Sequence, residues 1–557
     1  MRHYAANPDG ARWHVASAGG HSATTDELPT HLEFLLGGIG REHITIWVAN
    51  HATLERLMRQ HFLDEDGDPM KVSGKWCQPR MGSDGSLLSA RWGGRCWLRS
   101  AELWRKPAAE ERAELVVERI EALRAALDHA GVPLQGTPGS SAVEGWRMGE
   151  GSGRWTYQTW IGGDDETAQL DWMRKALYGG RCELLGGRGI YYAEGWYDEG
   201  AIGNAVQTLD PVELPADYRI WVLDLRTAYP AAMMRPMPDV WGGCRETGAL
   251  DLNQHGIAEV TIRLDGAAKA LPIRIRVGAS GRLRTFWPSR GTFRGVWTTT
   301  HLWAATRGGG GEVLECHRLI QWPKTTTRLR PYVARLLLAA EGSEGWVKSA
   351  AKGVARALYG RFAQSRSHWE LVDVSELLEA NRNTHPDAEY IEVGGKQILR
   401  VAGIWGPWAL CSVLEDHYPR SVNPAWATET TAICAAALAR AEYLAVQSGM
   451  TPLYCDTDGL HVAGTRAQLD ESGIAIGDGP GRWRLEGECT WTAYYAPRVY
   501  TTSDRSIRAA AGVPAAQRET LLREGWTDLV RVSTLREAMV SGVTPGTPSV
   551  VNYNLRR

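Results

Sequence analysis

The sequence lacks the features that mark several classes of protein. It has no run of the ~18 apolar residues that a membrane-spanning helix needs, and its first residues, Met-Arg-His-Tyr-Ala-Ala-Asn, do not form a signal peptide. Its nine cysteines are scattered and contain no Cys-x-x-Cys pair, so we expect neither structural zinc nor a disulfide framework. These absences predict a soluble protein of the cytoplasm.

Lysine and phenylalanine are scarce. Nine of the 62 basic residues are lysines, which leaves 62 − 9 = 53 arginines, and 5 phenylalanines stand beside 25 tryptophans. The skew is typical of a GC-rich genome. The net charge of −2 excludes a uniformly basic nucleic-acid coat but allows a local basic face. At 557 residues, and at roughly 150 residues per domain, the chain should form three or four units.

The amino-terminal part mixes short strands with loops. The alternating pattern of "HITIWVAN" (His43–Asn50) predicts a strand, and the spacing of Ala108–Gly131 predicts a helix that stops at its glycine. Glycine and serine in Gly136–Ser141 and Gly149–Arg154 indicate a linker. We therefore place a domain boundary near 150–165.

Two strand patterns and a basic stretch follow. "ALYGGRCELL" (Ala176–Leu185) predicts a helix end that runs through paired glycines into a strand. "RIWVLDL", from Arg219, predicts a buried strand that ends at Asp224, after which Pro230 opens a helix. Residues 262–294 carry eight Lys and Arg against one acid, which fits either a surface for a phosphate backbone or a solvated sheet face.

A cationic helix lies further along. Residues 328–363 predict two helices joined by a turn, and the second carries Lys348, Lys352 and Arg356 at spacings of four. This spacing puts the three cations on one face. Because like charges along one stripe cost stability unless an anion neutralises them, the stripe favours an anionic ligand.

"YCDTDGLHV" (Tyr454–Val462) sets Asp456 and Asp458 between two short apolar runs. Taken alone, Asp-Thr-Asp-Gly could simply reverse the chain. A calcium loop is excluded, because its fifth and twelfth positions would be Leu460 and Ala467. If this hairpin neighbours the strand ending at Asp224, three carboxylates converge. Such a cluster suits two Mg²⁺ ions, with Mn²⁺ as an alternative, in a nucleotidyl transferase.

Three motifs resemble those of the family B DNA polymerases. "DLRTAYPAAM" is similar to the motif Asp-x-x-Ser-Leu-Tyr-Pro, "KGVARALYGRF" to Lys-x-x-x-Asn-Ser-x-Tyr-Gly, and "YCDTDGLHV" to Tyr-x-Asp-Thr-Asp. They occur in the family's order. "LYGGR" resembles the Tyr-x-Gly-Gly segment with its tyrosine shifted by one place, and "APRVY" resembles the Lys-x-Tyr element that holds the primer end. The resemblance covers roughly Gln169–Ala511.

The resemblance implies a role for each matching residue. Asp224 and Asp458 would ligate the metals, with Asp456 contributing less directly. Tyr229 would exclude a 2′-hydroxyl, so its replacement by Ala should raise ribonucleotide incorporation. Contacts to the incoming nucleotide would come from Tyr229, Lys348, Lys352, Arg356 and Tyr359. Contacts to DNA would come from Tyr178, Gly179, Gly180, Arg181, Tyr454, Thr457, Arg498 and Tyr500.

The sequence departs from the family in its fingers and in its nuclease. Arg356 and Ala357 replace the fingers Asn and Ser, and Arg498 replaces a lysine, so nucleotide selection is affected more than the reaction itself. Asp-x-Glu is absent from the first forty residues, and the residue directly after Asn50 is not an aspartate. Glu118 is the nearest match to the last nuclease acid. We therefore predict a nuclease-shaped domain without proofreading activity.

This resemblance predicts an α+β right-hand polymerase, preceded in the chain by a degenerate exonuclease-like (RNase H-like) α/β domain. The expected domains are 1–165 exonuclease-like, 166–327 palm with a basic insert, 328–363 fingers, 364–490 palm and 491–557 thumb. Its compact length and basic insert resemble the protein-primed replicases of phages and plasmids, so a terminal protein could be a partner beside template-primer DNA and dNTPs.

Three alternatives stay open. One is a primer-independent, primase-like family B polymerase that starts strands on bare template. Another is a DNA-binding factor that keeps the fold without catalysis. The third is an enzyme that makes or copies RNA, against which Tyr229 argues.

Overall fold

The computed structural model describes most of the chain between residues 166 and 511 and shorter stretches on either side. Between those residues it leaves out 196–208, 247, 267–268, 278–281, 309, 385–389, 406–407, 420 and 505–507. Before residue 166 it describes 2–9, 12–17, 22–25, 28–29, 31–32, 35, 44–48, 51–62, 71–72, 75–81, 87–92, 96–100, 113–135 and 137–150. After residue 511 it describes 513, 517–518, 521, 526–532 and 548–554.

The chain forms two compact units. Unit 1 comprises Met1–Trp155, Tyr332–Val422 and Val532–Ser549, and unit 2 comprises Thr156–Pro331, Asn423–Arg531 and Val550–Arg557. The first division falls inside the range 150–165 predicted from the sequence. None of the described helices is both long enough and apolar enough to cross a membrane.

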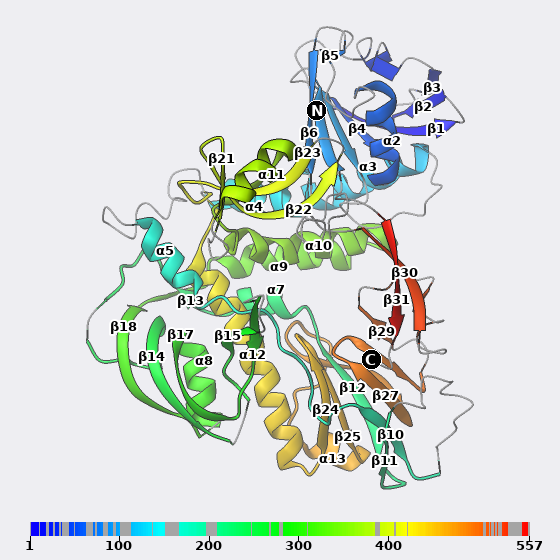
Figure 1. Cartoon of the computed structure of the whole chain (residues 1–557). Helices are drawn as coiled ribbons and strands as arrows, with labels where there is room; N and C mark the ends of the chain where they lie inside the picture. Colours follow the sequence, from blue (N-terminus) through cyan, green and yellow to red (C-terminus); the bar gives the residue numbers. More distant parts are fainter. Residues whose placement is uncertain are drawn as a thin grey trace. The chain divides into compact units, whose positions relative to one another are not determined.

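Unit 1 begins with a mixed eight-stranded sheet (Figure 1). Its order is β3 (Ser22–Thr25), β2 (Arg12–Ala16), β1 (Arg2–Asp9), β4 (Ile44–Val48), β8 (Cys96–Ser100), β7 (Leu87–Trp92), β6 (Lys75–Met81) and β5 (Lys71–Val72). The predicted strand is β4, which pairs in parallel with β1 and β8. All five of its residues are buried, because a central parallel strand is covered on both faces.

Helices α2 (His51–His61), α3 (Ala113–His129) and α4 (Pro138–Glu150) belong to the same unit. Helix α3 confirms the predicted helix, and Gly131 follows it with a φ of 72°, a backbone angle that favours glycine. The first residues of that prediction, 108–112, lie outside the described residues. The predicted linker is wrong over residues 138–141 and 149–150, which belong to α4, because the Thr137 hydroxyl accepts from the Ser140 N–H (3.1 Å) and Pro138 begins the helix.

Two further helices of unit 1 confirm the predicted pair, α9 (Leu329–Glu341) and α10 (Gly345–Phe362). Helix α10 packs against α4 and α3 through Ala350, Val354 and Leu358 among other buried residues. An antiparallel sheet follows, ordered β20 (Ser367–Asp373), β23 (Trp408–Leu414), β22 (Lys396–Trp405) and β21 (Ile391–Val393), with α11 (Val374–Asn383). Residues 364–422, which the sequence assigned to the palm, therefore lie in unit 1.

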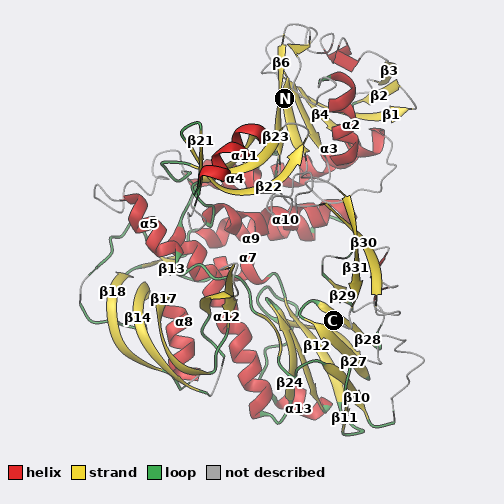
Figure 2. Ribbon diagram, viewed as in Figure 1, coloured by secondary structure: helices red, strands yellow, loops and turns green. Residues whose placement is uncertain are grey.

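Unit 2 is built on a five-stranded sheet ordered β26 (Trp483–Cys489), β12 (Arg219–Leu225), β25 (Gly459–Gly464), β24 (Thr451–Asp456) and β9 (Cys182–Leu184) (Figure 2). Strand β12 is the buried strand predicted from Arg219. The helix after it, α7, spans Ala228–Met233. Pro230 therefore lies in its first turn, where the backbone N–H that proline lacks would have no partner within the helix. The long helix α12 (Pro424–Gln447) contacts α7 and α5 (Glu166–Arg174); α13 (Arg466–Glu471) follows β25.

A second sheet of unit 2 joins segments far apart in the sequence. Its order is β11 (Pro211–Leu214), β10 (Gly189–Ala193), β27 (Trp491–Ala496), β28 (Val499–Thr502) and β29 (Ala509–Ala510). Residues 491–510 were assigned to the thumb from the sequence. These residues extend this sheet, in which β27 pairs with β10 over Trp491–Tyr494. The last described strands, β30 (Trp526–Val532) and β31 (Pro548–Asn554), pair with each other.

The basic insert is a separate layer of unit 2, a sheet of β17 (Arg290–Thr298), β14 (His255–Asp265) and β18 (Glu312–Trp322). A hairpin of β15 (Ile273–Val277) and β16 (Arg282–Phe286) and the short helices α8 (Thr299–Trp303) and η4 (Ala304–Gly308) complete it. Strands β13 (Met237–Pro238) and β19 (Thr325–Thr326) pair where the chain enters and leaves. Apolar residues of β14 and α8 share a core with Ala439 of α12, which fixes the insert to that helix.

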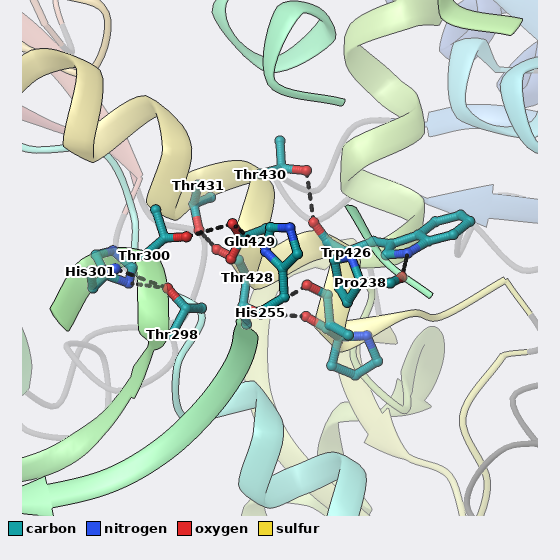
Figure 3. Close-up of polar contacts among 12 residues, drawn as sticks. Pro238, His255, Thr298, Thr300, His301, Trp426, Thr428, Glu429, Thr430 and Thr431 are labelled. Atoms are coloured by element: carbon teal, nitrogen blue, oxygen red, sulfur yellow. Dashed lines mark hydrogen bonds and ion pairs between the residues drawn. The ribbon is translucent and has the colours of Figure 1, made fainter. Parts of the chain in front are cut away.

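A buried polar cluster also ties the insert to α12 (Figure 3). Glu429, 3% exposed, accepts hydrogen bonds from the Thr300 hydroxyl (2.5 Å) and lies 3.1 Å from His255 Nδ1. Burial opposes the charged imidazole, but the Glu429 carboxylate outweighs it and raises the pKa of His255. Burial lowers the pKa of His301 to about 4. The buried carboxylate thus has hydroxyl and imidazole partners that compensate its desolvation.

Candidate functional site

In the five-stranded sheet of unit 2, Asp224 lies on β12, Asp456 lies on β24, and Asp458 lies in the turn that joins β24 to β25, the strand between them. Asp224, next to the end of β12, pairs with Gly459 of β25, and Asp456, at the end of β24, pairs with the same glycine. The Leu225 N–H donates to the Asp458 carbonyl (2.7 Å). The strands of the first and third motifs are therefore adjacent, as the sequence predicted.

The hairpin tip that carries the acids is tightly bent. The Asp458 N–H donates to the Asp456 carbonyl (2.6 Å), and Thr457 between them has a φ of 57°. The Thr457 N–H donates to the Arg181 carbonyl (2.6 Å), and a Cβ added at Gly180 would lie 2.3 Å from the Thr457 hydroxyl. Gly180 of "LYGGR" thus lets that segment lie directly against the tip, whereas a Cβ at Gly179 would meet no other atom.

Strained backbone gathers around the acids. In the described part of the chain, the non-glycine residues with positive φ are Thr227 (47°), Thr457 (57°) and Arg498 (63°). Thr227 lies three residues after Asp224, and the Arg498 side chain reaches Asp456. Non-glycine residues held in this conformation cost free energy and cluster at functional sites, so this distribution supports a site here.

Two arginines pair with two of the acids. The Arg498 Nε and Nη2 each lie 2.9 Å from an Asp456 carboxylate oxygen, and hydrogen bonding to that carboxylate raises the pKa of Arg498. Arg484 lies on β26, beside the strand that carries Asp224. Its Nη2 lies 3.3 Å from Asp224 Oδ2 and also donates to Glu486. In the described residues, no three His, Cys, Asp or Glu side chains form a group that could hold a metal ion.

An aromatic cluster supports the hairpin from below. The Tyr454 ring, 1% exposed, stacks on Tyr494 with centroids 5.6 Å apart and lies 5.1 Å from Tyr500. Its hydroxyl accepts from the Arg498 N–H (3.2 Å). His461 Nδ1 lies 2.8 Å from the Tyr494 hydroxyl. Burial lowers the pKa of His461 to about 3 and raises the pKa of Tyr500 to about 12, so the cluster is uncharged at neutral pH.

His461 should make the fold sensitive to acid. Its pKa is about 3 when folded and 6.5 when exposed, so in this range the unfolded chain binds a proton that the folded chain does not. Its contribution to stability is complete above pH 6.5 and falls as the pH drops, by about 1.4 kcal/mol at pH 5.5. Between pH 7 and pH 5.5, the free energy of unfolding measured with urea should fall by about 1 kcal/mol less in His461→Gln than in wild type. Equal losses would contradict this account.

Three of the residues predicted to contact DNA are buried and support the site. Tyr178, 5% exposed, donates to the Val296 carbonyl (3.1 Å), and Tyr454 lies within the aromatic cluster. Arg181, 2% exposed, pairs with Glu183 (2.9 Å) and Glu442. Buried charges need such partners, so burial gives these side chains a structural role, and their contacts to DNA stay a prediction. Gly179 and Gly180 are exposed, and Thr457, Arg498 and Tyr500 are at least partly accessible.

The predicted nucleotide contacts divide between the units. Tyr229 lies in α7 of unit 2, against the core of the five-stranded sheet. Lys348, Lys352, Arg356 and Tyr359 lie in α10 of unit 1, beside its buried face; Arg356 is exposed and the others are half-buried. The helical stripe is confirmed, whereas the contacts to a nucleotide stay a prediction.

Several cations of the basic insert are neutralised by acids from other parts of the chain. Arg294 pairs with Glu259 (2.8 Å), Arg263 with Glu312, and Lys269 with Glu183. Arg274 lies 4.4 Å over the Tyr178 ring and donates to the Lys175 carbonyl. These acids lie outside residues 262–294, so the local count of charges overstated the free positive charge. The result favours the solvated-face interpretation for these four cations.

The donor chemistry at the acids fits Mg²⁺. Asp224, on β12, and Asp458, in the turn before β25, provide hard carboxylate oxygens. Mg²⁺ is usually held by one or two carboxylates, with waters and substrate phosphates as the remaining ligands. These two residues are therefore the ones that would hold it.

Sequence reasoning missed Arg484 and Glu486. Strand β26 is shifted against β12 between Val222 and Leu223, where Gly487 and Leu485 are the respective partners and Glu486 is bulged out. Bulges often re-aim side chains near functional sites. The alternating pattern of "WRLEGEC" indicates a strand, but only the register shows that Arg484 faces Asp224.

Comparison with known proteins agrees with this arrangement. Residues 203–400 match the family of type B DNA polymerases, organellar and viral; the match includes Asp224 and α10 but ends before Asp456. No curated protein matches the chain.

Among solved structures, a complex of Phi29 DNA polymerase with primer-template DNA and incoming nucleotides is similar over 99% of this chain and 98% of that chain, with a TM-score of 0.62 and 13% identity. Phi29 DNA polymerase with single-stranded DNA has the same TM-score and identity over 100% and 99% of the two chains. This likeness shows the fold. Residues 203–400 are thus similar to the type B DNA polymerases of the organellar and viral type, and the chain as a whole has the fold of Phi29 DNA polymerase.

Proposed function

We propose that this chain is a DNA-directed DNA polymerase of family B, which adds dNTPs to the 3′-hydroxyl of a primer, directed by a template, with two divalent ions at Asp224 and Asp458. The observation that carries the proposal is the pairing of β12 with β25, in which Asp224 lies opposite Gly459 and the Leu225 N–H donates to the Asp458 backbone carbonyl (2.7 Å). The Phi29 polymerase, similar in fold, binds primer-template DNA and incoming nucleotides, which supports the same substrates here.

The side chains at the site have distinct proposed roles. Bound Mg²⁺ would activate the attacking oxygen and stabilise the leaving one in an in-line displacement. Asp224 and Asp458 would hold it, while Asp456 keeps Arg498 in place through two hydrogen bonds. Arg498 would hold the primer end, and Tyr229 would exclude a 2′-hydroxyl. Lys348 and Lys352 would neutralise the triphosphate from α10.

We also propose that the chain does not proofread. The support is the absence of Asp-x-Glu from the first forty residues and the solvent-exposed position of Glu118 on α3. Asn50, the other residue compared with the nuclease motifs, lies outside the described residues. Without paired carboxylates, the metal ions that a 3′–5′ exonuclease uses for hydrolysis lack their ligands. A terminal protein as primer stays a prediction from resemblance.

One labelled-primer assay tests the proposed reaction. With Mg²⁺, dNTPs and a primed template, we expect stepwise extension to the end of the template, and with unprimed circular single strands we expect no product. Product on the unprimed strand would favour the primer-independent alternative, and no extension under any condition would contradict the proposal.

The same assay without dNTPs tests proofreading. A mismatched 3′ end should remain at full length, because no nuclease metals bind. Rapid trimming of that end would show an active nuclease and refute this part of the proposal.

A further inference from the structure

Arg484 presents a positive charge to one of the two proposed metal ligands. Asp224 and Arg484 are direct partners in the pairing of β12 with β26, and Arg484 Nη2 lies 3.3 Å from Asp224 Oδ2. Opposite residues in an antiparallel pair have closely spaced Cβ atoms. The backbone register therefore keeps the guanidinium near this carboxylate, whatever else binds there.

A second acid holds the guanidinium in place. Arg484 and Glu486 lie two residues apart on β26, and the Nη2 atom that contacts Asp224 also donates to Glu486. Glu486 is the bulged residue of the strand. The three side chains are 43%, 31% and 37% exposed for Arg484, Asp224 and Glu486, so solvent screens the pair only in part and a divalent ion has access to it.

We propose that Arg484 occupies Asp224 in the nucleotide-free enzyme and lowers its affinity for divalent cations, so that the site loads metal together with the nucleotide. This inference rests on the proposed function of Asp224. A cation a few ångströms from a carboxylate neutralises it and repels a doubly charged ion. The triphosphate of an incoming dNTP supplies further anionic oxygens, which outweigh that repulsion and complete the metal's coordination.

The two arginines at the site have different acidic partners. The strand that carries Asp224 has Gly459 on one side and Arg484 on the other. Arg498, the other arginine at the site, instead pairs with Asp456 through both Nε and Nη2. Removing Arg484 therefore changes the charge next to one proposed metal ligand and leaves the Asp456 pair intact.

Mn²⁺ binding by the full-length protein tests the proposal without DNA, nucleotide or catalysis. Electron paramagnetic resonance measures free Mn²⁺ during a titration, and the binding lost in Asp458→Asn defines the site. We expect Arg484→Gln to bind Mn²⁺ roughly three- to tenfold more tightly than wild type. Arg484→Lys, which keeps the charge, should bind as wild type does. Adding dATP should tighten Mn²⁺ binding more in wild type than in Arg484→Gln.

The matched control is Arg466→Gln, which removes an exposed arginine of unit 2 that pairs with Asp470 (3.0 Å) and should leave Mn²⁺ affinity unchanged. Unchanged or weaker binding in Arg484→Gln would overturn the proposal, as would equal tightening in Arg466→Gln. Asp224→Asn in the Arg484→Gln background separates a failure of the proposed function from a failure of the proposed role of Arg484. If it does not weaken binding, Asp224 is not a metal ligand and the proposed function of the site fails; if it does, only the role of Arg484 is in question.

Discussion

Asp458→Asn should extend a labelled primer at least about a thousandfold more slowly than wild type. The change keeps the size of the side chain and removes its charge, so the loss reports on metal binding rather than packing. A bound metal contributes several kcal/mol of stabilisation to charge in the transition state, and each 1.36 kcal/mol is tenfold in rate. Single-turnover extension in a quench-flow apparatus measures the rate of chemistry directly.

The Asp458→Asn variant should fold as wild type does, because this side chain lies at a hairpin tip and is not part of the core. Asp470→Asn, which alters an exposed acid of α13 in the same unit, is the matched control and should extend the primer at the wild-type rate. Extension by Asp458→Asn within tenfold of wild type would favour the DNA-binding interpretation, in which the fold is kept without catalysis.

Arg498→Ala should slow extension about a hundredfold, with a weaker affinity for the primer end. The structure places this side chain by two hydrogen bonds to Asp456 and its N–H by one to Tyr454. A displacement of about 1 Å in a positioned group can cost about this much. Arg498→Lys should recover part of the rate, since the ammonium keeps the charge but loses the two-pronged contact.

A double-mutant cycle decides how Asp456 acts. If Asp456 works by holding Arg498, the rate of the Asp456→Ala and Arg498→Ala double variant should match that of the slower single variant, because both changes remove the same interaction. If the two rate losses multiply, Asp456 has a role of its own, such as binding metal, and the proposed positioning role is wrong.

The sequence predicted the site's local elements because their signals are local. The apolar run before Asp224, the Asp-Thr-Asp-Gly turn and the cation spacing of α10 each depend on a few adjacent residues, and each element is present. The fold class followed from the order of motifs and is matched over the full chain. Which strands neighbour one another was a hypothesis until the sheet order confirmed it.

The errors arose where distant residues decide the outcome. Arg181 reads as a surface cation in the sequence, but its two partners include Glu442, which is 261 residues away. The composition of residues 136–141 and 149–154 indicated a linker, yet Thr137 and Pro138 start a helix that packs against α10. Arg484 gave no signal at all, because its contact with Asp224 depends on a strand register shifted by one residue.

The central claim is that Asp224 and Asp458 together hold the catalytic metals. Its most direct test is an anomalous difference map from crystals of the protein with primer-template DNA, a non-hydrolysable dNTP analogue and Mn²⁺. We predict strong peaks within coordination distance of carboxylate oxygens of both residues, and their loss in crystals of Asp458→Asn. A map in which the bound Mn²⁺ lies away from both carboxylates would contradict the account.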